Sequence, residues 1–494
     1  MKIMLISSIV THSAQTNPEW TAENDVGDFP PIGLMYIAGY LRNYAPHHVI
    51  KLLDANLLSY TQEDIRKEVM SFQPEVVGMT VYTDILFDCL ETMKVVKSIS
   101  KDIYMVVGGA HPNKHIEETK TIPEVDFICL GEGEILFAEL IDALEGKRDL
   151  SNIKGLVRRD TNGKFVENGG TNYIEDLNSL PYPAFDLLPF KKYYSIVGTG
   201  SPVGVICSSR GCPFKCTYCS KLYDTYRVRS PENIIGEIKL YYDQGIREFM
   251  FFDDMFNLPA KRALDVSKML RENFKDIQWS FRGRADQITE ELAKELRESK
   301  CILVTLGAEA HKDEIQKELR TGKRIEYIKR AVQFLRKNKI KVNTNWIIGL
   351  PQHKSAKDIE ELLKVIFEID SDYVQFAILM LWDDTELYRD AVKRKIIDPK
   401  IWEDFIKKPT EKMLIPAWEE HMSRKEQSEL LRHCYVKFYL RPKVIYRQLM
   451  SIRSWKMFET QFKGFVLILI PLFYPLIRFF VPDLSRRKKI HKLD

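Results

Sequence analysis

The chain of 494 residues is 45% hydrophobic and 29% charged, which is typical of a globular protein with two or three domains. Its 73 lysines and arginines against 69 acidic residues leave a net charge of +4, which gives no argument for a nucleic-acid partner, and we expect none. Eight cysteines without a secretory signal favour a reducing cytoplasm over a disulfide framework.

The first 145 residues alternate short β-rich runs with amphipathic helical patterns. The strands are expected at residues 2–7, 49–53, 76–81, 103–107 and 127–130. The helices are expected at residues 32–44, 63–72, 85–100 and 134–144. Because strand and helix alternate, we predict an α/β fold with a doubly wound, Rossmann-like parallel sheet, which binds its ligands at the carboxyl ends of its strands.

Three of these strand ends carry residues that suit a ligand. Thr80 and Thr83 offer hydroxyl groups after the third strand, and Gly108 and Gly109 let a ligand approach the backbone after the fourth. Glu132 follows the fifth strand, between two glycines. Each signal is also typical of ordinary turn chemistry, so the expected site depends on their combination.

Residues 146–200 are expected to connect this domain to the next. A short hairpin, with strands at 155–159 and 164–167, is indicated by the Asn-Gly turn between them. A proline-rich stretch at 180–189 then disfavours regular structure, and its aromatic residues are expected to hold the two domains together.

The next domain, residues 201–410, again alternates strands and helices. Its strands are expected at residues 203–207, 249–252, 278–282, 303–306, 342–348 and 373–379. Its helical patterns cover residues 233–242, 261–273, 290–299, 326–337 and 356–368. Six parallel strands with outer helices predict a partial (β/α)6 barrel whose site lies at the carboxyl ends of the strands.

Three thiols follow the first strand of this barrel at a spacing of three and then two residues. Cys212, Cys216 and Cys219 form this pattern. A 4Fe-4S cluster needs four ligands, so three thiolates on one loop would leave one iron open to bind something other than protein. Lys215 would add positive charge that helps to keep the thiolates ionised.

Structural zinc and a fourth cysteine are the alternatives to an open cluster. Structural zinc normally takes four protein ligands in two separated pairs, and the chain has no second Cys-x-x-Cys pair. Cys207 could supply a fourth ligand, but it ends the apolar run 203–207, which favours a core cysteine.

With Tyr218 just before the last cysteine, this loop resembles the signature of the radical S-adenosylmethionine enzymes. The resemblance implies that Cys212, Cys216 and Cys219 hold a 4Fe-4S cluster and that Tyr218 lies beside the cofactor. It also implies that S-adenosylmethionine chelates the open iron through its amino and carboxylate groups. One electron from a donor such as flavodoxin or ferredoxin would then generate a 5'-deoxyadenosyl radical.

The stretch Ser-Ser-Arg-Gly-Cys-Pro-Phe at 208–214 narrows the resemblance to the subgroup with an N-terminal cobalamin-binding domain, such as the anaerobic magnesium-protoporphyrin IX monomethyl ester cyclases. Residues 30–34, 108–112 and 130–134 are similar to segments of that domain. The resemblance therefore implies that cobalamin binds at the strand ends that carry Thr80, Thr83, Gly108, Gly109 and Glu132.

One known cobalamin pattern is missing. No Asp-x-His-x-x-Gly follows the first strand, so cobalt is expected to have no protein imidazole as its axial ligand. His12 is the only histidine of that loop and is expected to be a solvated loop residue. His111, which precedes Pro112, is expected to shape its turn.

Other strand-end residues of the barrel are candidates for holding S-adenosylmethionine. Arg284, just past the third strand, could pair with the methionyl carboxylate, and Glu309 could meet the ammonium or ribose groups. Asp253 and Asp254 end the second strand, where they could do acid-base work or simply form a hydrogen-bonded loop or helix cap.

The last region, residues 411–494, is expected to be helical with a possible membrane anchor. Thirteen uncharged residues at 465–477 are broken by Pro471 and Pro475 and fall short of the about 20 that cross a bilayer. With the basic tail at 486–489, they favour peripheral contact with the inner face of the cell membrane. A buried helix or a dimer contact is the alternative.

Three functions are compatible with these patterns. The first is a radical enzyme that uses methylcobalamin to methylate an unactivated carbon of an apolar small molecule, lipid-like or tetrapyrrole. The second is a radical cyclase or rearrangement enzyme without methyl transfer. The third is a non-catalytic cobalamin or iron-sulfur sensor, against which the open three-thiolate site speaks.

Overall fold

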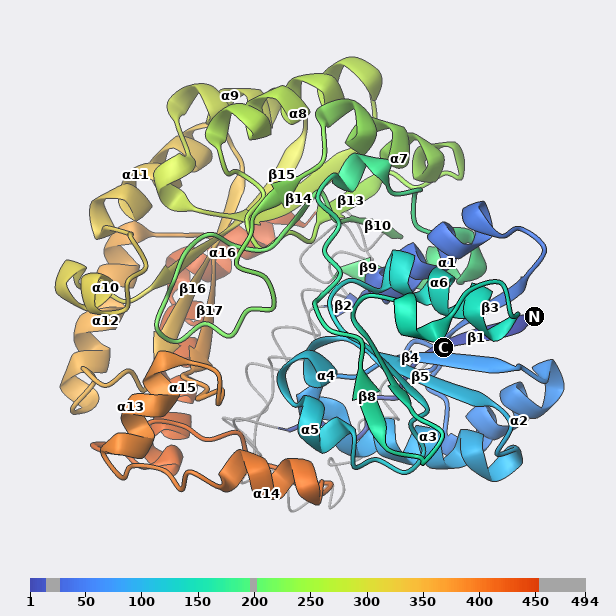
Figure 1. Ribbon diagram of the computed structural model, residues 1–494. Helices are drawn as coiled ribbons and strands as arrows, with labels where there is room; N and C mark the ends of the chain where they lie inside the picture. Colours follow the sequence, from blue (N-terminus) through green and yellow to red (C-terminus); the bar gives the residue numbers. More distant parts are fainter. Residues whose placement is uncertain (15–26, 196–201, 453–494) are drawn as a thin grey trace, which may run out of the picture.

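The computed structural model describes residues 1–14, 27–195 and 202–452 of the chain. Two sheets, each covered by its own helices, form two halves that face each other (Figure 1). The blue and cyan half on the right contains a seven-stranded sheet in the order β3-β1-β4-β5-β6-β7-β8. The green to orange half on the left contains a six-stranded sheet in the order β10-β13-β14-β15-β16-β17.

The first half confirms the predicted doubly wound sheet. Its parallel strands are β1 (Lys2–Ser7), β3 (Val49–Asp54), β4 (Val76–Thr80), β5 (Tyr104–Gly108) and β6 (Phe127–Cys129). Its longer helices are α1 (Ile32–Tyr44), α2 (Gln62–Phe72), α3 (Leu86–Ile99) and α6 (Gly133–Leu144). The central strands are buried on both faces, which is why they are continuous apolar runs rather than alternating ones.

The hairpin predicted for the connector extends this first sheet. Its strands β7 (Leu156–Arg159) and β8 (Phe165–Glu167) are antiparallel, and β7 pairs with β6. The carboxylate of Asp160 accepts hydrogen bonds from the backbone N–H groups of Asn162 and Lys164, both at 2.9 Å, and so stabilises the turn. The hairpin was expected from its turn residues, but nothing in the local sequence indicates that it pairs with β6.

The second half confirms the predicted partial barrel. Its six parallel strands are β10 (Val203–Ile206), β13 (Glu248–Phe251), β14 (Gln278–Gly283), β15 (Cys301–Glu309), β16 (Lys341–Ile348) and β17 (Tyr373–Ile378). The outer helices are α7 (Pro231–Asp243), α8 (Ala260–Asn273), α9 (Glu290–Glu298), α11 (Ile325–Lys337) and α12 (Ala356–Ile369). A short helix, α10 (Asp313–Glu318), was not predicted.

A C-terminal helix covers the outer edge of this second sheet. Tyr435 and Tyr439 lie one turn apart on α15 (Arg424–Tyr439). The Tyr435 hydroxyl bonds to the backbone N–H and C=O of Phe376, and the Tyr439 hydroxyl bonds to those of Val374, at 2.9 to 3.2 Å. These hydroxyls take the place of a further strand along β17.

The remaining C-terminal helices are α13 (Glu386–Lys393), α14 (Ile401–Lys407) and α16 (Pro442–Ser451). Among the helices that the structure describes, none combines the length and the apolar character that a membrane span requires. The predicted anchor at 465–494 lies outside the described residues.

Candidate functional site

The cysteine loop leaves the end of β10 through a narrow neck. Two short antiparallel strands, β11 (Ser209–Arg210) and β12 (Arg227–Val228), bracket residues 211–226. Gly211 begins the loop with φ of +82°, and a Cβ there would lie 2.2 Å from the carbonyl oxygen of Thr225. Only glycine allows the two sides of the neck to come this close.

The three cysteines lie on this loop where the spacing predicted them. Cys212 and Cys216 are partly buried and Cys219 is exposed. The Lys221 ammonium donates to the carbonyl oxygens of Cys212 and Phe214, both at 2.9 Å, and so closes the loop on itself. The loop therefore holds its shape through backbone contacts and leaves the thiols available.

Burial and neighbouring charges set the protonation of two of these thiols. Burial raises the pKa of Cys216, while the nearby Lys323 ammonium opposes this effect. Burial and the other thiols raise the pKa of Cys219 to about 11. Lys215, which was expected to supply positive charge beside the thiols, is exposed. The positive charge that acts on Cys216 comes instead from Lys323, in the segment between α10 and α11.

The three thiols are not drawn together as they would be around a single metal ion. A tetrahedral zinc with Zn–S bonds of about 2.3 Å would draw thiolates to about 3.8 Å from one another. Among the described residues, only His47, His48 and Glu145 place three potential ligand atoms within 4.8 Å of one another, so the cysteines are more widely spread. In a 4Fe-4S cluster each thiolate binds a different iron, so the three thiols do not have to converge on one point.

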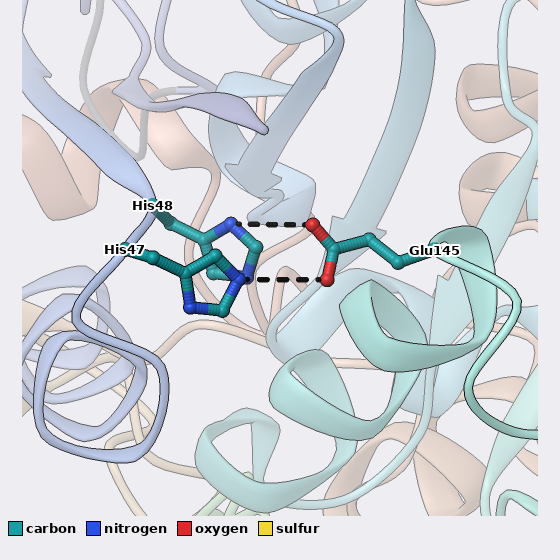
Figure 2. A group of neighbouring side chains, drawn as sticks. All are labelled: His47, His48 and Glu145. Carbon is teal, nitrogen blue, oxygen red and sulfur yellow. Dashed lines mark ion pairs between the residues drawn. The ribbon is translucent and has the colours of Figure 1, made fainter.

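The group of His47, His48 and Glu145 lies at the start of β3, on the side of the first sheet opposite the carboxyl strand ends. Both imidazoles face the Glu145 carboxylate, at 3.6 Å from His47 Nε2 and 3.7 Å from His48 Nδ1 (Figure 2). Lys147 pairs with the same carboxylate at 2.5 Å and, with the histidines, lowers the pKa of Glu145 to about 2. The group precedes β3 and follows α6, so it forms an ion-pair cluster away from the strand ends that carry the predicted site.

Glu309 lies near the cysteine loop, at the end of its strand. It ends β15 with φ of +62°, and its carboxylate pairs with Lys323 at 2.8 Å. Its charge acts on the pKa of Cys216, Cys219 and Tyr218, which places all three close to it. Glu309, Tyr218 and Lys323 thus form a charged and aromatic rim beside the thiols.

Arg284 lies against the cysteine loop, and its charge acts on the pKa of Cys216. Its side chain is 1% exposed, and it donates to Asp286 at 2.8 Å and to the Thr321 carbonyl at 2.9 Å. The guanidinium also lies 3.8 Å from the ring centroid of Phe214, a loop residue. In this position it supports the loop, and its donors are committed to protein acceptors.

The two aspartates that end β13 have different surroundings. Asp253 is buried and accepts from the backbone N–H groups of Ser208 at 2.6 Å and Ser209 at 3.0 Å, which favours the hydrogen-bonded loop interpretation. Asp254 is exposed and lies near Cys219, on whose pKa its charge acts. Asp254 is therefore the aspartate that lies closer to the open side of the thiol loop.

The strand ends of the first half bring four of the predicted residues together. Thr80 pairs in register with Gly108 across β4 and β5. A Cβ on Gly109, whose φ is +100°, would lie 2.7 Å from the Thr80 methyl group, so glycine is required for the two ends to meet. The Thr83 hydroxyl lies 3.1 Å from Nδ1 of His111 in the same edge.

Other protein groups hold His111 and His12 in place, and the backbone of His111 bonds to Val81 and His115 in its turn. The ring of His111 is buried, and its Nε2 has no hydrogen-bond partner within the part of the chain that the structure describes. Buried polar atoms normally have a partner, so a water or a ligand at this position would complete the hydrogen bonding of the ring. His12 was expected to be solvated, but its Nδ1 lies 2.8 Å from the buried carboxylate of Asp88, which holds the ring in place.

The strand ends of the two halves face each other directly. Lys114, in the segment after β5, pairs with Asp384 at 2.8 Å and donates to the hydroxyl of Ser220 in the cysteine loop. His115 lies 3.6 Å from Asp383 in the same contact. The edge that carries Thr83 and Gly109 is thereby joined to the loop that carries the thiols.

Comparisons with known proteins match both halves. Residues 21–141 match a B12 binding domain, and residues 206–366 match the Radical SAM superfamily. The chain is 33% identical over 426 residues to an uncharacterized methyltransferase of Pyrococcus horikoshii, covering 85% of this chain and 90% of that protein. The chain belongs to the cobalamin-binding radical S-adenosylmethionine enzymes. Its cofactors are accordingly a 4Fe-4S cluster, S-adenosylmethionine and cobalamin.

Other relatives of this radical S-adenosylmethionine enzyme differ in their named activity. The anaerobic magnesium-protoporphyrin IX monomethyl ester cyclase of Rubrivivax gelatinosus is 28% identical over 377 residues, which are 74% of this chain and 66% of that protein. The solved structure of OxsB with aqua-cobalamin and S-adenosylmethionine has a TM-score of 0.70 at 17% identity and covers 98% of this chain and 73% of that chain. That structure supports the fold.

Proposed function

We propose that this radical S-adenosylmethionine enzyme methylates an unactivated carbon of an apolar small molecule. The contact of Lys114 with Asp384 and Ser220 is the observation that carries the proposal, because it joins the cobalamin half to the cysteine loop. When bound, the cluster and S-adenosylmethionine supply a radical that abstracts hydrogen, and cobalamin supplies a methyl group. Because the two cofactor sites would face each other, the radical and the methyl group could both reach one substrate carbon.

Particular side chains would hold each cofactor. Cys212, Cys216 and Cys219 would bind the cluster, and the rim of Tyr218 and Glu309 would contact S-adenosylmethionine. Glu309 suits the ammonium or ribose groups because it is a carboxylate beside the thiols, with Lys323 holding one of its oxygens at 2.8 Å.

The first half offers a surface of hydroxyl and backbone groups for cobalamin. Thr80, Thr83, Gly108 and Gly109 lie together at the strand ends, where a flat ligand can approach the backbone. Nε2 of His111 supplies a polar contact at the same edge. A ligand that bonds to this atom would remove the cost of burying it without a partner.

A radical cyclase is the second candidate. The 28% identical cyclase of Rubrivivax gelatinosus favours it, since the same radical would start ring closure without methyl transfer. A sensor without turnover has no such support, because the matched relatives are named as enzymes.

The apolar substrate also motivates a peripheral membrane contact. Residues 465–494 combine an apolar run with a basic tail, which would place the enzyme where lipid-like substrates occur. An electron donor such as flavodoxin or ferredoxin would reduce the cluster. A chain truncated after Lys463 should leave the membrane fraction, and retention there would contradict the contact.

The product pattern separates the two candidate reactions. The full chain, reconstituted anaerobically with iron, sulfide, cobalamin and a chemical reductant, is incubated with S-adenosylmethionine and either an apolar lipid extract or magnesium-protoporphyrin IX monomethyl ester. Methylation predicts S-adenosylhomocysteine and 5'-deoxyadenosine together. A product formed with 5'-deoxyadenosine but without S-adenosylhomocysteine would contradict the methyltransferase and support the cyclase.

A further inference from the structure

The carboxylate of Glu132, one of the residues predicted to bind cobalamin, is fully occupied by protein donors. Its side chain is 2% exposed, and its carboxylate accepts from Arg210 at 2.9 Å and from Arg227 at 2.7 and 3.0 Å. The backbone N–H of Ile174 donates to the same carboxylate at 2.6 Å. Both oxygens therefore have partners, which are protein groups.

These two arginines form the neck of the cysteine loop. Arg210 of β11 and Arg227 of β12 are cross-strand partners, so they hold the two ends of residues 211–226 side by side. Arg210 also donates to Glu134 at 2.5 Å. Two carboxylates from the segment after β6 thus bind both ends of the loop that carries the three thiols, and buried bidentate pairs of this kind have a fixed geometry.

A second contact holds the neck from α1 of the first half. Arg229, directly after β12, donates to the Tyr36 hydroxyl at 2.9 Å and pairs with Glu237. The Arg210 guanidinium lies 5.2 Å from the centre of the Tyr36 ring. The neck is therefore bound to the first half through both the β6 segment and helix α1.

The β6 segment is also joined to the edge where cobalamin is proposed to bind. The Asn113 side chain donates to the carbonyl of Gly109 and accepts from the N–H of Gly131, both at 2.8 Å. Gly131 is the neighbour of Glu132. Asn113 thus links the Gly109 edge to the residue that precedes Glu132, whose carboxylate holds the neck.

We propose that Glu132 is a positioning residue that couples cobalamin binding in the first half to S-adenosylmethionine binding at the cysteine loop. The proposal depends on the cofactor placement given above. A purely structural salt bridge would stabilise the contact between the halves but would leave the two affinities independent of each other. A coupling residue makes the affinity for one ligand depend on the other.

The test compares the dissociation constant of S-adenosylmethionine with and without hydroxocobalamin. The constant is measured from the change that S-adenosylmethionine causes in the electron paramagnetic resonance signal of the reduced cluster, using the full chain. In the natural enzyme, cobalamin should change this constant at least about fivefold. In Glu132→Gln the change should fall below about twofold, while iron content stays the same. Glu139→Gln, which alters an ion pair with Arg148 elsewhere on α6, should behave as the natural enzyme.

Each outcome decides the proposal. If Glu132→Gln does not fold, Glu134→Gln removes only one bond to Arg210 and should give an intermediate ratio. The ratio compared is that of the S-adenosylmethionine dissociation constants without and with cobalamin. If this ratio in a folded variant equals that of the natural enzyme, or if it is one in the natural enzyme with both cofactors bound, the coupling alone is overturned. A natural chain that binds no cluster or no cobalamin overturns the proposed function, and the coupling with it.

Discussion

Replacing Arg284 by alanine should destabilise the second half and loosen its cysteine loop. The guanidinium is buried, pairs with Asp286 at 2.8 Å and stacks on Phe214 at 3.8 Å. Removing one partner of a buried pair costs about 3 to 5 kcal/mol because the other charge is left without compensation. For a domain of this size, such a loss lowers the melting temperature by about 6 to 20 °C.

The assay is thermal unfolding of the anaerobic protein, followed by near-ultraviolet circular dichroism, together with its iron content. Arg284→Ala should melt earlier and retain less cluster, because Phe214 belongs to the loop that holds the cysteines. Arg284→Lys is the matched variant, since it keeps the charge but loses the planar guanidinium. Its melting temperature and iron content should lie between those of the natural enzyme and of Arg284→Ala. A normal melting temperature and iron content with weaker S-adenosylmethionine binding would refute this reasoning and would return Arg284 to a direct contact with that ligand.

Three further results are expected. Burial lowers the pKa of His111 and of His353 to about 3, so below pH 6.5 the unfolded chain takes up protons that the folded chain excludes. The free energy of unfolding of the cofactor-free chain should therefore be highest above pH 6.5 and fall towards pH 3, by up to about 4 kcal/mol for each group. Urea midpoints that do not change between pH 7 and 5 would contradict this. Replacing Tyr435 and Tyr439 together by phenylalanine removes the hydroxyls that cover β17 and should promote aggregation on light scattering, whereas an equally monomeric variant would show that the edge needs no such cover. Gly211→Ala should reduce iron content because its Cβ would meet the Thr225 carbonyl, and full cluster loading would argue against a rigid neck.

The order of strands and helices and the position of the cysteine loop could be predicted because both depend on local sequence. Alternating apolar runs indicated the two sheets, and the spacing of Cys212, Cys216 and Cys219 indicated the loop after the first barrel strand. Glu309 was found in the same way, as a polar residue at a strand end.

The contacts that organise the site could not be predicted because they join residues far apart in the chain. Glu132 binds Arg210 and Arg227, which lie 78 and 95 positions away, and no periodicity connects them. Lys323 has no strand-end signal, yet it provides the positive charge near Cys216. Arg284 follows a strand as expected, but only tertiary packing places its side chain against Phe214 of the loop.

The central claim is that the cluster and cobalamin bind at edges that face each other, and one spectroscopic measurement tests it most directly. The full chain is loaded with both cofactors and reduced, and its electron paramagnetic resonance spectrum is compared with those of chains that carry the reduced cluster or Co(II) cobalamin alone. If the two sites face each other, the two signals should broaden each other through magnetic coupling. The triple variant with Cys212→Ala, Cys216→Ala and Cys219→Ala should lose both the cluster and the broadening. A spectrum of the doubly loaded chain that equals the sum of the two separate spectra would contradict the account.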